Sequence, residues 1–421
     1  MGSLFSLWNI LIIQQFRDTH SNGSYLIATK NCHENNRRQA ILPDIFQRYI
    51  CSTDKTTAMI PTRNPSHINN ITQTIVEKLK NYPNLYRYTQ SPYDINVTAL
   101  IIWTKQKHQK YLVYSCRFMC GGWGDRTRKI VGSFLLSVVL NRTFIIDMTW
   151  PCSITHILTS NFIQWNNRIL LNKNYSSINI TTLTSQDYDK LMAYDKLYDV
   201  LYIQTSNIAY FNLIIQQSHL YSSLKTRFNL KHKHIHIQTL YQLLYDLLIQ
   251  LKPNIKIKLN QLLKQIKPNT TLLCGQLRIG RNPTNPKDVV FPKREKMNVT
   301  VMDFLVKQSK ITQSKVFITT DSNDVQYLAR QTFKRSLLEI NGTIAHIDRD
   351  WNYLGCASLE KTIVEFHMLS YCHTAVISKS SFGYLAVMRR SQPYKQLYLY
   401  CDGIKKINNA TDYDKFVYST C

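Results

Sequence analysis

The sequence predicts an α/β protein built from two tandem Rossmann-like domains that face a cleft. Two observations support this fold class. From residue 271 onward, short β-rich runs alternate with helical runs, a spacing typical of a parallel sheet with right-handed crossovers. Within residues 111–147, an apolar strand, a glycine-rich turn, a helical run and a second strand form one β-loop-α-β unit.

The predicted organisation has three parts. Residues 1–95 are polar, poorly periodic and interrupted by prolines, so we expect an N-terminal extension or stem. Residues 96–266 hold the first β-loop-α-β unit, followed by a segment rich in Leu, Tyr and Gln with helical spacing at 239–251. Residues 267–421 hold the regular strand and helix alternation and form the second Rossmann-like domain.

Each predicted element follows from local pattern. In the first domain, β-like runs at 111–116 and 143–147 flank a helical run at 128–140. In the second, strands are expected at 271–279, 315–321, 343–348, 374–379 and 395–401, with helices at 299–309, 322–333, 358–372 and 381–390 between them. Ligands of such sheets bind at the carboxyl ends of the strands.

The charge is strongly positive but diffuse. The formal net charge is +26 and the isoelectric point is about 9.6, which is compatible with nucleic acid, an anionic membrane surface or a phosphorylated ligand. Nucleic-acid binding proteins gather cations among exposed aromatic residues. Here Lys, Asn, Ile and Tyr are abundant throughout the chain and the aromatics lie in apolar runs. The sequence therefore does not favour a nucleic-acid partner.

Cysteines and glycosylation sequons indicate the secretory pathway, in the endoplasmic reticulum or Golgi lumen. The ten cysteines include no C-x-x-C pair, which argues against a zinc ribbon, and their even number fits disulfides of open connectivity. Ten Asn-x-Ser/Thr sequons are present, although Asn141 falls in an expected core element and should be silent.

The N-terminus leaves two interpretations open. Its apolar run is about a dozen residues long, too short to span a bilayer, and it lacks a basic start. A weak or truncated signal anchor, and hence membrane anchoring, is the preferred interpretation. Gly2 and Ser6 also fit the loose myristoylation pattern, which implies a cytosolic protein.

Four polar segments lie at predicted strand ends. They are GGWGDR with Asp125 expected to cap the next helix, GQLRIGR with Arg278 and Arg281, ITTDSNDV with Thr319, Thr320 and Asp321, and ISKSSFGYLA with Ser378, Ser380 and Ser381. Glycines allow close approach of the backbone to an anion, arginine binds phosphate bidentately, and hydroxyl groups add donors. Each segment alone also fits an ordinary turn, an internal ion pair or a helix cap. Because all four segments are expected at the carboxyl-end edge of the inferred sheets, a ligand site at that edge is favoured.

These segments, in this order, resemble the successive motifs of the GT-B fucosyltransferase superfamily, over about residues 110–400. That superfamily includes α1,2- and α1,6-fucosyltransferases, xyloglucan fucosyltransferases and protein O-fucosyltransferases. The resemblance implies inverting, metal-independent transfer of fucose from GDP-fucose to a glycan or protein hydroxyl. It implies no cofactor and no metal, with the donor held mainly by the C-terminal domain and the acceptor by the N-terminal one.

The resemblance also implies site residues. Arg278 would hold the β-phosphate and assist departure of GDP, with Gln276 beside it in the same motif. The remaining positions would bind substrate: Thr320 and Asp321 near the nucleoside, Ser378, Ser380, Ser381, Phe382 and Gly383 beside the pyrophosphate, and Gly121, Gly122, Gly124, Asp125 and Arg126 facing fucose and acceptor. Cations at the positive end of a helix would then be explained by Arg126 reaching toward a diphosphate.

The chain departs from the motif in two places. Many members carry His-x-Arg-Arg where this chain has Gln276 to Ile279, so a second arginine is missing and the motif is closer to the xyloglucan branch. The O-fucosyltransferases have Asn where this chain has Asp125. An inverting enzyme must deprotonate its acceptor, so Asp125 is a candidate general base as well as a candidate helix cap.

Three alternatives remain open from the sequence. Asp348 and Asp350 form a D-x-D spacing like that of metal-dependent GT-A glycosyltransferases. His232, His234 and His236 alternate and could bind a metal or lie on an exposed strand or loop. The chain could also be a non-enzymatic protein that binds nucleic acid or glycans.

Overall fold

The computed structural model describes residues 65–82, 85, 97–105, 108–166, 174–184, 187–204, 218–228, 237–280, 282, 285, 288, 294, 296–348 and 355–419. The chain divides into two compact units, Met1–Gln73 and Thr74–Cys421. Helix α3 (Pro65–Lys80) runs across this boundary, and every other element belongs to the second unit. The expected N-terminal anchor and the three alternating histidines lie outside the described residues. No described helix is both long enough and apolar enough to cross a membrane.

The first sheet is parallel and four-stranded, in the order β2-β1-β5-β4. Its strands are β1 (Tyr111–Cys116), β2 (Thr143–Met148), β4 (Ser177–Ile180) and β5 (Val200–Ile203). The helices around it are α5 (Val97–Thr104), α6 (Trp123–Val139), α7 (Tyr188–Leu197), α9 (Ser218–Phe228) and α10 (Ile237–Leu248). A small antiparallel pair, β3 (Leu158–Ser160) and β6 (Ile249–Leu251), lies beside it. The predicted β-loop-α-β unit is β1, α6 and β2.

Helix α6 is the central element of this first part. Its sequence is apolar on nearly every side, and all of its residues except Asp125 and Arg128 are buried. A helix that is hydrophobic all round must be covered on all sides. It packs on β1 and β2 and also contacts α9, α10 and α15 (Ser381–Val387), a helix of the second sheet. The two sheets are therefore joined through one shared helix.

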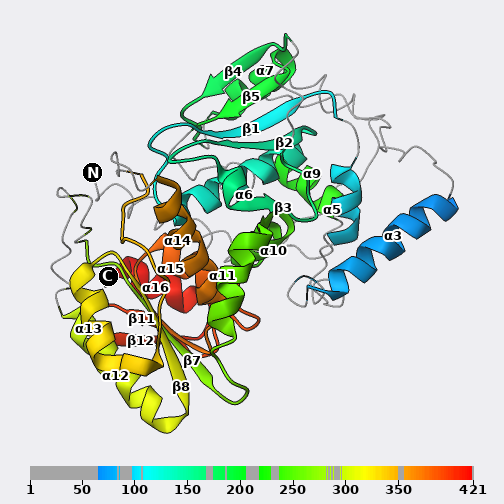
Figure 1. The fold of residues 1–421 in the computed structure, drawn as a ribbon. Coiled ribbons are helices and arrows are strands. Elements are labelled where there is room, and N and C mark those ends of the chain that lie inside the picture. The colour runs from blue at the N-terminus through cyan, green and yellow to red at the C-terminus, as the bar shows by residue number, and fades with distance from the viewer. Residues whose placement is uncertain are drawn as a thin grey trace, which may run out of the picture. The chain divides into compact units, whose positions relative to one another are not determined.

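The second sheet has the strand order β12-β11-β10-β7-β8-β9. Its strands are β7 (Thr271–Leu277), β8 (Ser314–Thr320), β9 (Leu337–Leu338), β10 (Thr374–Ser378), β11 (Leu397–Tyr400) and β12 (Ile404–Ile407), and only the β11–β12 pair is antiparallel among these. The helices are α11 (Pro253–Leu263), α12 (Met297–Ile311), α13 (Asn323–Phe333), α14 (Gly355–Met368), α15 (Ser381–Val387) and α16 (Ala410–Ser419) (Figure 1). Numbered from β7, the order reads 3-2-1-4-5-6, that of the dinucleotide-binding fold.

The expected fold class is therefore confirmed, with two local corrections. Residues 343–348 do not form the predicted strand, because β9 is the two-residue strand Leu337–Leu338 and residues 343–347 line a pocket instead. Asn141 was expected in a core element, but it is an exposed residue in the turn after α6, with a positive φ of 58° that suits asparagine.

Three disulfides are fully described. Cys116–Cys120 closes the short loop after β1, and Cys274–Cys372 ties β7 to the segment before β10. Cys152–Cys356 joins the segment after β2 to the start of α14, across a separation of 204 residues. This last bridge closes the longest loop, so its expected effect on the entropy of the unfolded chain is the largest of the three.

Glycine at position 124 should be essential for the junction between α6 and α15. A Cβ there would lie 2.4 Å from the backbone nitrogen of Phe382, and backbone cannot yield as a flexible side chain can. We expect Gly124→Ala to lower the free energy of unfolding by about 1–3 kcal/mol, as overpacking does. Gly122→Ala is the matched control, since a Cβ there meets only Asp125 Oδ2 at 4.0 Å and should cost less than about 1 kcal/mol. Denaturant titration of both variants checks this, and equal losses would contradict it.

His367 on α14 should make stability fall in mild acid. It is fully buried, its Nε2 lies 3.1 Å from the Tyr245 hydroxyl, and burial together with the nearby Arg389 charge holds its pKa well below the usual value. The folded protein keeps this imidazole neutral, whereas the unfolded chain protonates it below pH about 6.5, so stability is lost as pH falls. Between pH 7.5 and 5 the wild type should lose about 2 kcal/mol more than His367→Gln. Urea unfolding at both pH values measures it, and identical pH profiles would refute it.

Candidate functional site

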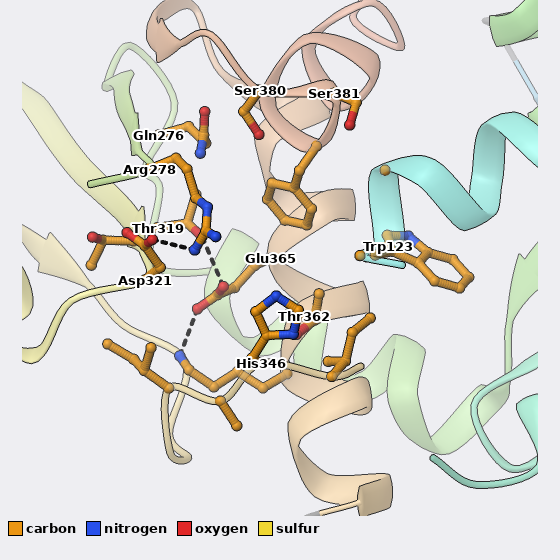
Figure 2. A pocket seen from close by; sticks show the side chains of 18 of the residues that line it. Trp123, Gln276, Arg278, Thr319, Asp321, His346, Thr362, Glu365, Ser380 and Ser381 are labelled. Carbon is orange, nitrogen blue, oxygen red and sulfur yellow. Dashed lines mark hydrogen bonds and ion pairs between the residues drawn. The ribbon is translucent and has the colours of Figure 1, made fainter. Parts of the chain in front are cut away.

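A pocket of about 400 Å³ opens at the carboxyl ends of β7 and β8, between the first turns of α6 and α15. In Figure 2, Arg278 and Glu365 project into this space, with Trp123 on the opposite side. Its lining comprises Gly122–Asp125, Gln276, Arg278, Arg294, Thr319–Asp321, Thr343–Ile347, Lys361, Thr362, Glu365 and Lys379–Phe382.

The strand order explains why the pocket forms here. In the second sheet β8 and β9 are added on one side of β7, whereas β10 and the strands after it are added on the other side. The strand order therefore reverses between the neighbouring strands β7 and β10. The loops that follow these two strands leave in opposite directions, and this leaves a crevice at the switch point. Arg278 directly follows β7, and Ser380 and Ser381 come shortly after β10. Sequence reasoning placed these side chains at one edge, and the structure brings them to one pocket.

Arg278 is held in place by two carboxylates. One guanidinium nitrogen pairs with Asp321 and the other donates to Asp288 Oδ1 at 2.9 Å, while its backbone N–H donates to Ser378 Oγ at 3.0 Å. Asp321 also accepts the backbone N–H groups of Ile279 and Gly280, both at 2.8 Å. The Arg278 side chain remains 27% exposed, so a ligand can still reach it. Its position is fixed before any ligand arrives.

Ser378 and Gly383, two of the expected binding residues, are not part of the pocket lining but contact the side chain of Gln276, which is. Ser378 is fully buried and donates to Gln276 Oε1 at 3.0 Å. Gly383 faces the same side chain, and a Cβ there would lie 2.3 Å from Gln276 Oε1. Ser378 and Gly383 thus fix the orientation of Gln276, which does line the pocket.

Arg294 is a pocket residue that sequence reasoning missed. It donates to the carbonyl oxygens of Arg278 at 2.7 Å and Lys379 at 2.9 Å, and so connects the two strand ends. Burial, and then the positive charge of Arg278, lower the pKa of Arg294 to about 10, which still leaves it cationic at neutral pH. The sequence around it has no helical or strand periodicity, so no pattern distinguishes it from the other cations of the chain.

A buried cluster on α14 was also missed. Glu365 accepts from Thr319 Oγ1 at 2.8 Å and pairs with Lys361 Nζ at 2.5 Å, and Lys361 also donates to the Ile340 carbonyl at 2.9 Å. Both charged side chains are almost fully buried and both line the pocket. A carboxylate has about four acceptor positions, so Glu365 retains acceptor capacity toward a ligand.

Asp125 is not the helix cap that the sequence suggested. Helix α6 begins at Trp123 with Gly122 at the N-cap position, so Asp125 lies within the first turn. The helix therefore begins three residues earlier than a cap at Asp125 would imply. Asp125 instead accepts a hydrogen bond from Ser381 Oγ at 2.8 Å, across the pocket from Gln276 and Arg278, and it still gains from the positive end of the helix.

The cations of α6 do not reach toward the pocket, contrary to the expectation for Arg126. Arg126 is fully buried, lies outside the pocket lining, and donates from Nε to the Gly121 carbonyl at 2.7 Å and from another nitrogen to Asp348 Oδ1 at 3.3 Å. Burial lowers the pKa of Arg126, with Asp348 opposing that shift. Lys129 donates to the Cys120 carbonyl at 2.7 Å, and burial lowers the pKa of this amine too. Both cations organise the glycine turn by binding its carbonyl groups; Gly121 itself lies outside the lining.

The metal-site alternatives find little support in the described residues. Asp348 is buried against Arg126, and Asp350 lies outside the described part of the chain. One group with metal-like spacing occurs among those residues, Cys152, His156 and Cys356, but the two cysteines are joined as a disulfide. Cysteine binds a metal as the free thiolate, and a disulfide sulfur is not one.

Comparisons with known proteins give structural likeness only. No family model matches the chain, and no curated protein matches it in sequence. Among solved structures, NodZ α-1,6-fucosyltransferase of Bradyrhizobium, co-crystallised with GDP, is 13% identical with a TM-score of 0.46, over 72% of this chain and 99% of that one. A mutant of Arabidopsis thaliana FUT1 in complex with GDP is 14% identical with a TM-score of 0.47, over 80% of each chain. POFUT1 in complex with GDP is 7% identical with a TM-score of 0.38, over 70% of this chain and 99% of that one. At these values the function has to be argued from the residues of this chain.

Proposed function

We propose that this chain is a glycosyltransferase that transfers fucose from GDP-fucose to a glycan or protein hydroxyl, with inversion and without a metal. The observation that carries the proposal is Arg278, ordered by Asp321 and Asp288 yet partly exposed, at the switch point of a sheet with the nucleotide-binding strand order. A guanidinium at that crevice suits the β-phosphate of a nucleoside diphosphate, which it can bind in a bidentate manner.

The chemistry assigned to Arg278 is stabilisation of the leaving group. As the glycosidic bond to the donor breaks, negative charge grows on the β-phosphate oxygen. A fixed cation in the pocket stabilises that charge without having to reorganise during the reaction. Ser380 lines the same pocket and supplies a hydroxyl donor for the pyrophosphate, whereas the single O–H of Ser381 is donated to Asp125.

Glu365 supports guanine as the base. The Watson–Crick edge of guanine presents N–H donors, and a carboxylate that retains acceptor positions can bind two of them. Adenine presents an acceptor at the corresponding ring nitrogen, which a carboxylate would repel. Lys361 Nζ and Thr319 Oγ1 hold the Glu365 carboxylate in place at 2.5 and 2.8 Å. Glu365 could therefore distinguish guanine from adenine without the entropy cost of ordering a mobile side chain.

Asp125 is the candidate general base for the acceptor hydroxyl. It lines the pocket on the α6 side, away from Arg278, and its contact with Ser381 Oγ at 2.8 Å orients the carboxylate. Attack from the side opposite the leaving diphosphate inverts the anomeric carbon, and a base on that wall is where such a mechanism needs it. The secretory compartment remains part of the proposal, supported by the disulfides and the sequons. Membrane anchoring is proposed from the apolar N-terminal run of the sequence alone.

Replacing Arg278 tests the proposal directly. We expect Arg278→Lys to keep the fold, since the charge beside Asp321 and Asp288 is retained, but to lower kcat for fucose transfer about 100-fold or more, because an ammonium cannot make the bidentate contact. Arg330→Lys, in an exposed pair with Glu339, is the matched control. Transfer and donor hydrolysis, each with and without EDTA, are the readouts.

Unchanged turnover in Arg278→Lys would eliminate the assigned role. Loss of activity with EDTA, restored by Mn²⁺, would favour the metal-dependent alternative based on Asp348 and Asp350. Salt-sensitive binding of RNA together with no binding of GDP would favour a nucleic-acid-binding protein.

Glu365→Gln should weaken selectivity for guanine. The amide presents one acceptor and one donor group, so GDP affinity should fall about tenfold or more while ADP affinity changes less. Isothermal titration with both nucleotides measures this, and Glu339→Gln, on the exposed pair, is the control. Since the change leaves Lys361 without its carboxylate partner, the melting temperature is recorded in parallel. Parallel losses for GDP and ADP would count against base recognition by Glu365.

A further inference from the structure

The loop closed by the Cys116–Cys120 disulfide exposes two adjacent apolar side chains. Phe118 is 51% exposed and Met119 47%. Single exposed hydrophobic residues are ordinary on protein surfaces. Here two exposed apolar residues are adjacent in a loop of five residues closed by a disulfide. The aromatic ring of Phe118 contacts that of Trp150 edge to face, with ring centroids 5.3 Å apart. Phe118 and Trp150 together form an aromatic platform.

The platform is held rigidly. Arg117 donates two hydrogen bonds to Asp147 Oδ2, at 2.9 and 2.8 Å, and the Cys116 carbonyl accepts the N–H groups of Thr149 and Trp150. Lys129 donates a hydrogen bond to the Cys120 carbonyl. Met119 has a φ of 45°, a left-handed conformation that a non-glycine residue adopts only where its surroundings impose it. An exposed aromatic ring on such a fixed loop binds a ligand with little loss of conformational entropy.

The platform lies next to the donor pocket. Phe118 precedes Gly122, the first residue of the α6 wall of the pocket, by four positions, so their Cα atoms lie within roughly 14 Å. The Trp150 carbonyl accepts a hydrogen bond from Arg126, in the first turn of the same helix. The platform is therefore on the side of the pocket that carries Asp125, away from Arg278. One or two sugar rings would bridge this separation.

We propose that Phe118 and Trp150 form an acceptor subsite that stacks against a pyranose ring of a glycan. This inference rests on the proposed function and narrows its acceptor to a carbohydrate. The C–H groups on one face of a pyranose pack on the electron-rich face of an aromatic ring. Arg117 and Asp147, a half-exposed ion pair beside the platform, supply donors and acceptors for the hydroxyl groups at the edge of the sugar.

A peptide acceptor suits this surface less well. Extended peptides bind by adding a strand to an open sheet edge. The nearest edge is β2, but the N–H of Ile146 in the middle of this strand already donates to the Trp165 carbonyl at 3.2 Å. The local surface therefore offers an aromatic face with polar neighbours and not an open strand edge.

The test is glycan binding by the full chain saturated with GDP. Chitotetraose, cellotetraose and N-acetyllactosamine are the probes, with saturation-transfer NMR and titration calorimetry as readouts. We expect at least one probe to bind the wild type and Phe118→Ala to raise its Kd about tenfold or more, with a smaller change in GDP affinity. Phe118→Trp should restore binding. Tyr327→Ala, which removes a 63% exposed ring from α13, is the control and should leave glycan affinity unchanged.

The outcomes separate the two proposals. A wild type that binds no GDP invalidates the proposed function. A wild type that binds GDP while Phe118→Ala binds glycans as the wild type does, or while none of the three glycans binds, overturns the acceptor subsite alone. Binding of a Ser/Thr-containing heptapeptide that depends on Phe118, without glycan binding, would assign the platform to a protein acceptor and overturn the inference.

Discussion

The close approach of two helix starts is the constraint on which the site depends. Gly124 on α6 has no room for a Cβ against the backbone of Phe382 on α15, and Ser381 donates to Asp125 across the same contact. Each helix follows a strand of a different sheet, so this contact brings the ligand-binding ends of both sheets to one pocket. A larger residue at position 124 would separate the donor wall from the wall that bears Asp125.

Positive charge at the start of α6 serves the same junction. Three cations at the positive end of a helix are unfavourable by themselves. Arg126 and Lys129 are nevertheless buried there, because the carbonyl groups of Gly121, Cys120 and Trp150 and the carboxylate of Asp348 accept their hydrogen bonds. The cations thus replace water around a turn whose backbone would otherwise be poorly satisfied. Their function is to shape the wall of the pocket.

The sequence predicts the parts of the site that follow strands and fails where position depends on tertiary packing. Arg278, Thr320, Asp321 and Ser381 were found because strand ends share one edge of a sheet. Glu365 was not found, since it lies mid-helix in an apolar pattern and becomes a pocket residue only through its contacts with Thr319 and Lys361. The segment 343–347 has a strand-like composition, but the pocket-lining loop it forms is set by tertiary contacts. Aspartate is a residue type that favours the N-cap position, and only the observed helix start at Trp123 excludes that role for Asp125.

Two cations of the pocket, Arg278 and Lys361, are already paired with carboxylates, and this bears on how a diphosphate can bind. Arg278 is satisfied by Asp321 and Asp288, and Lys361 by Glu365, so no lining cation in these pairs has to move to find a partner. A bound phosphate must share Arg278 with carboxylates of the same sign, which limits the gain in ground-state affinity. When the leaving group gains charge in the transition state, the already fixed guanidinium interacts more strongly without reorganisation. Such an arrangement favours catalysis over tight retention of the product.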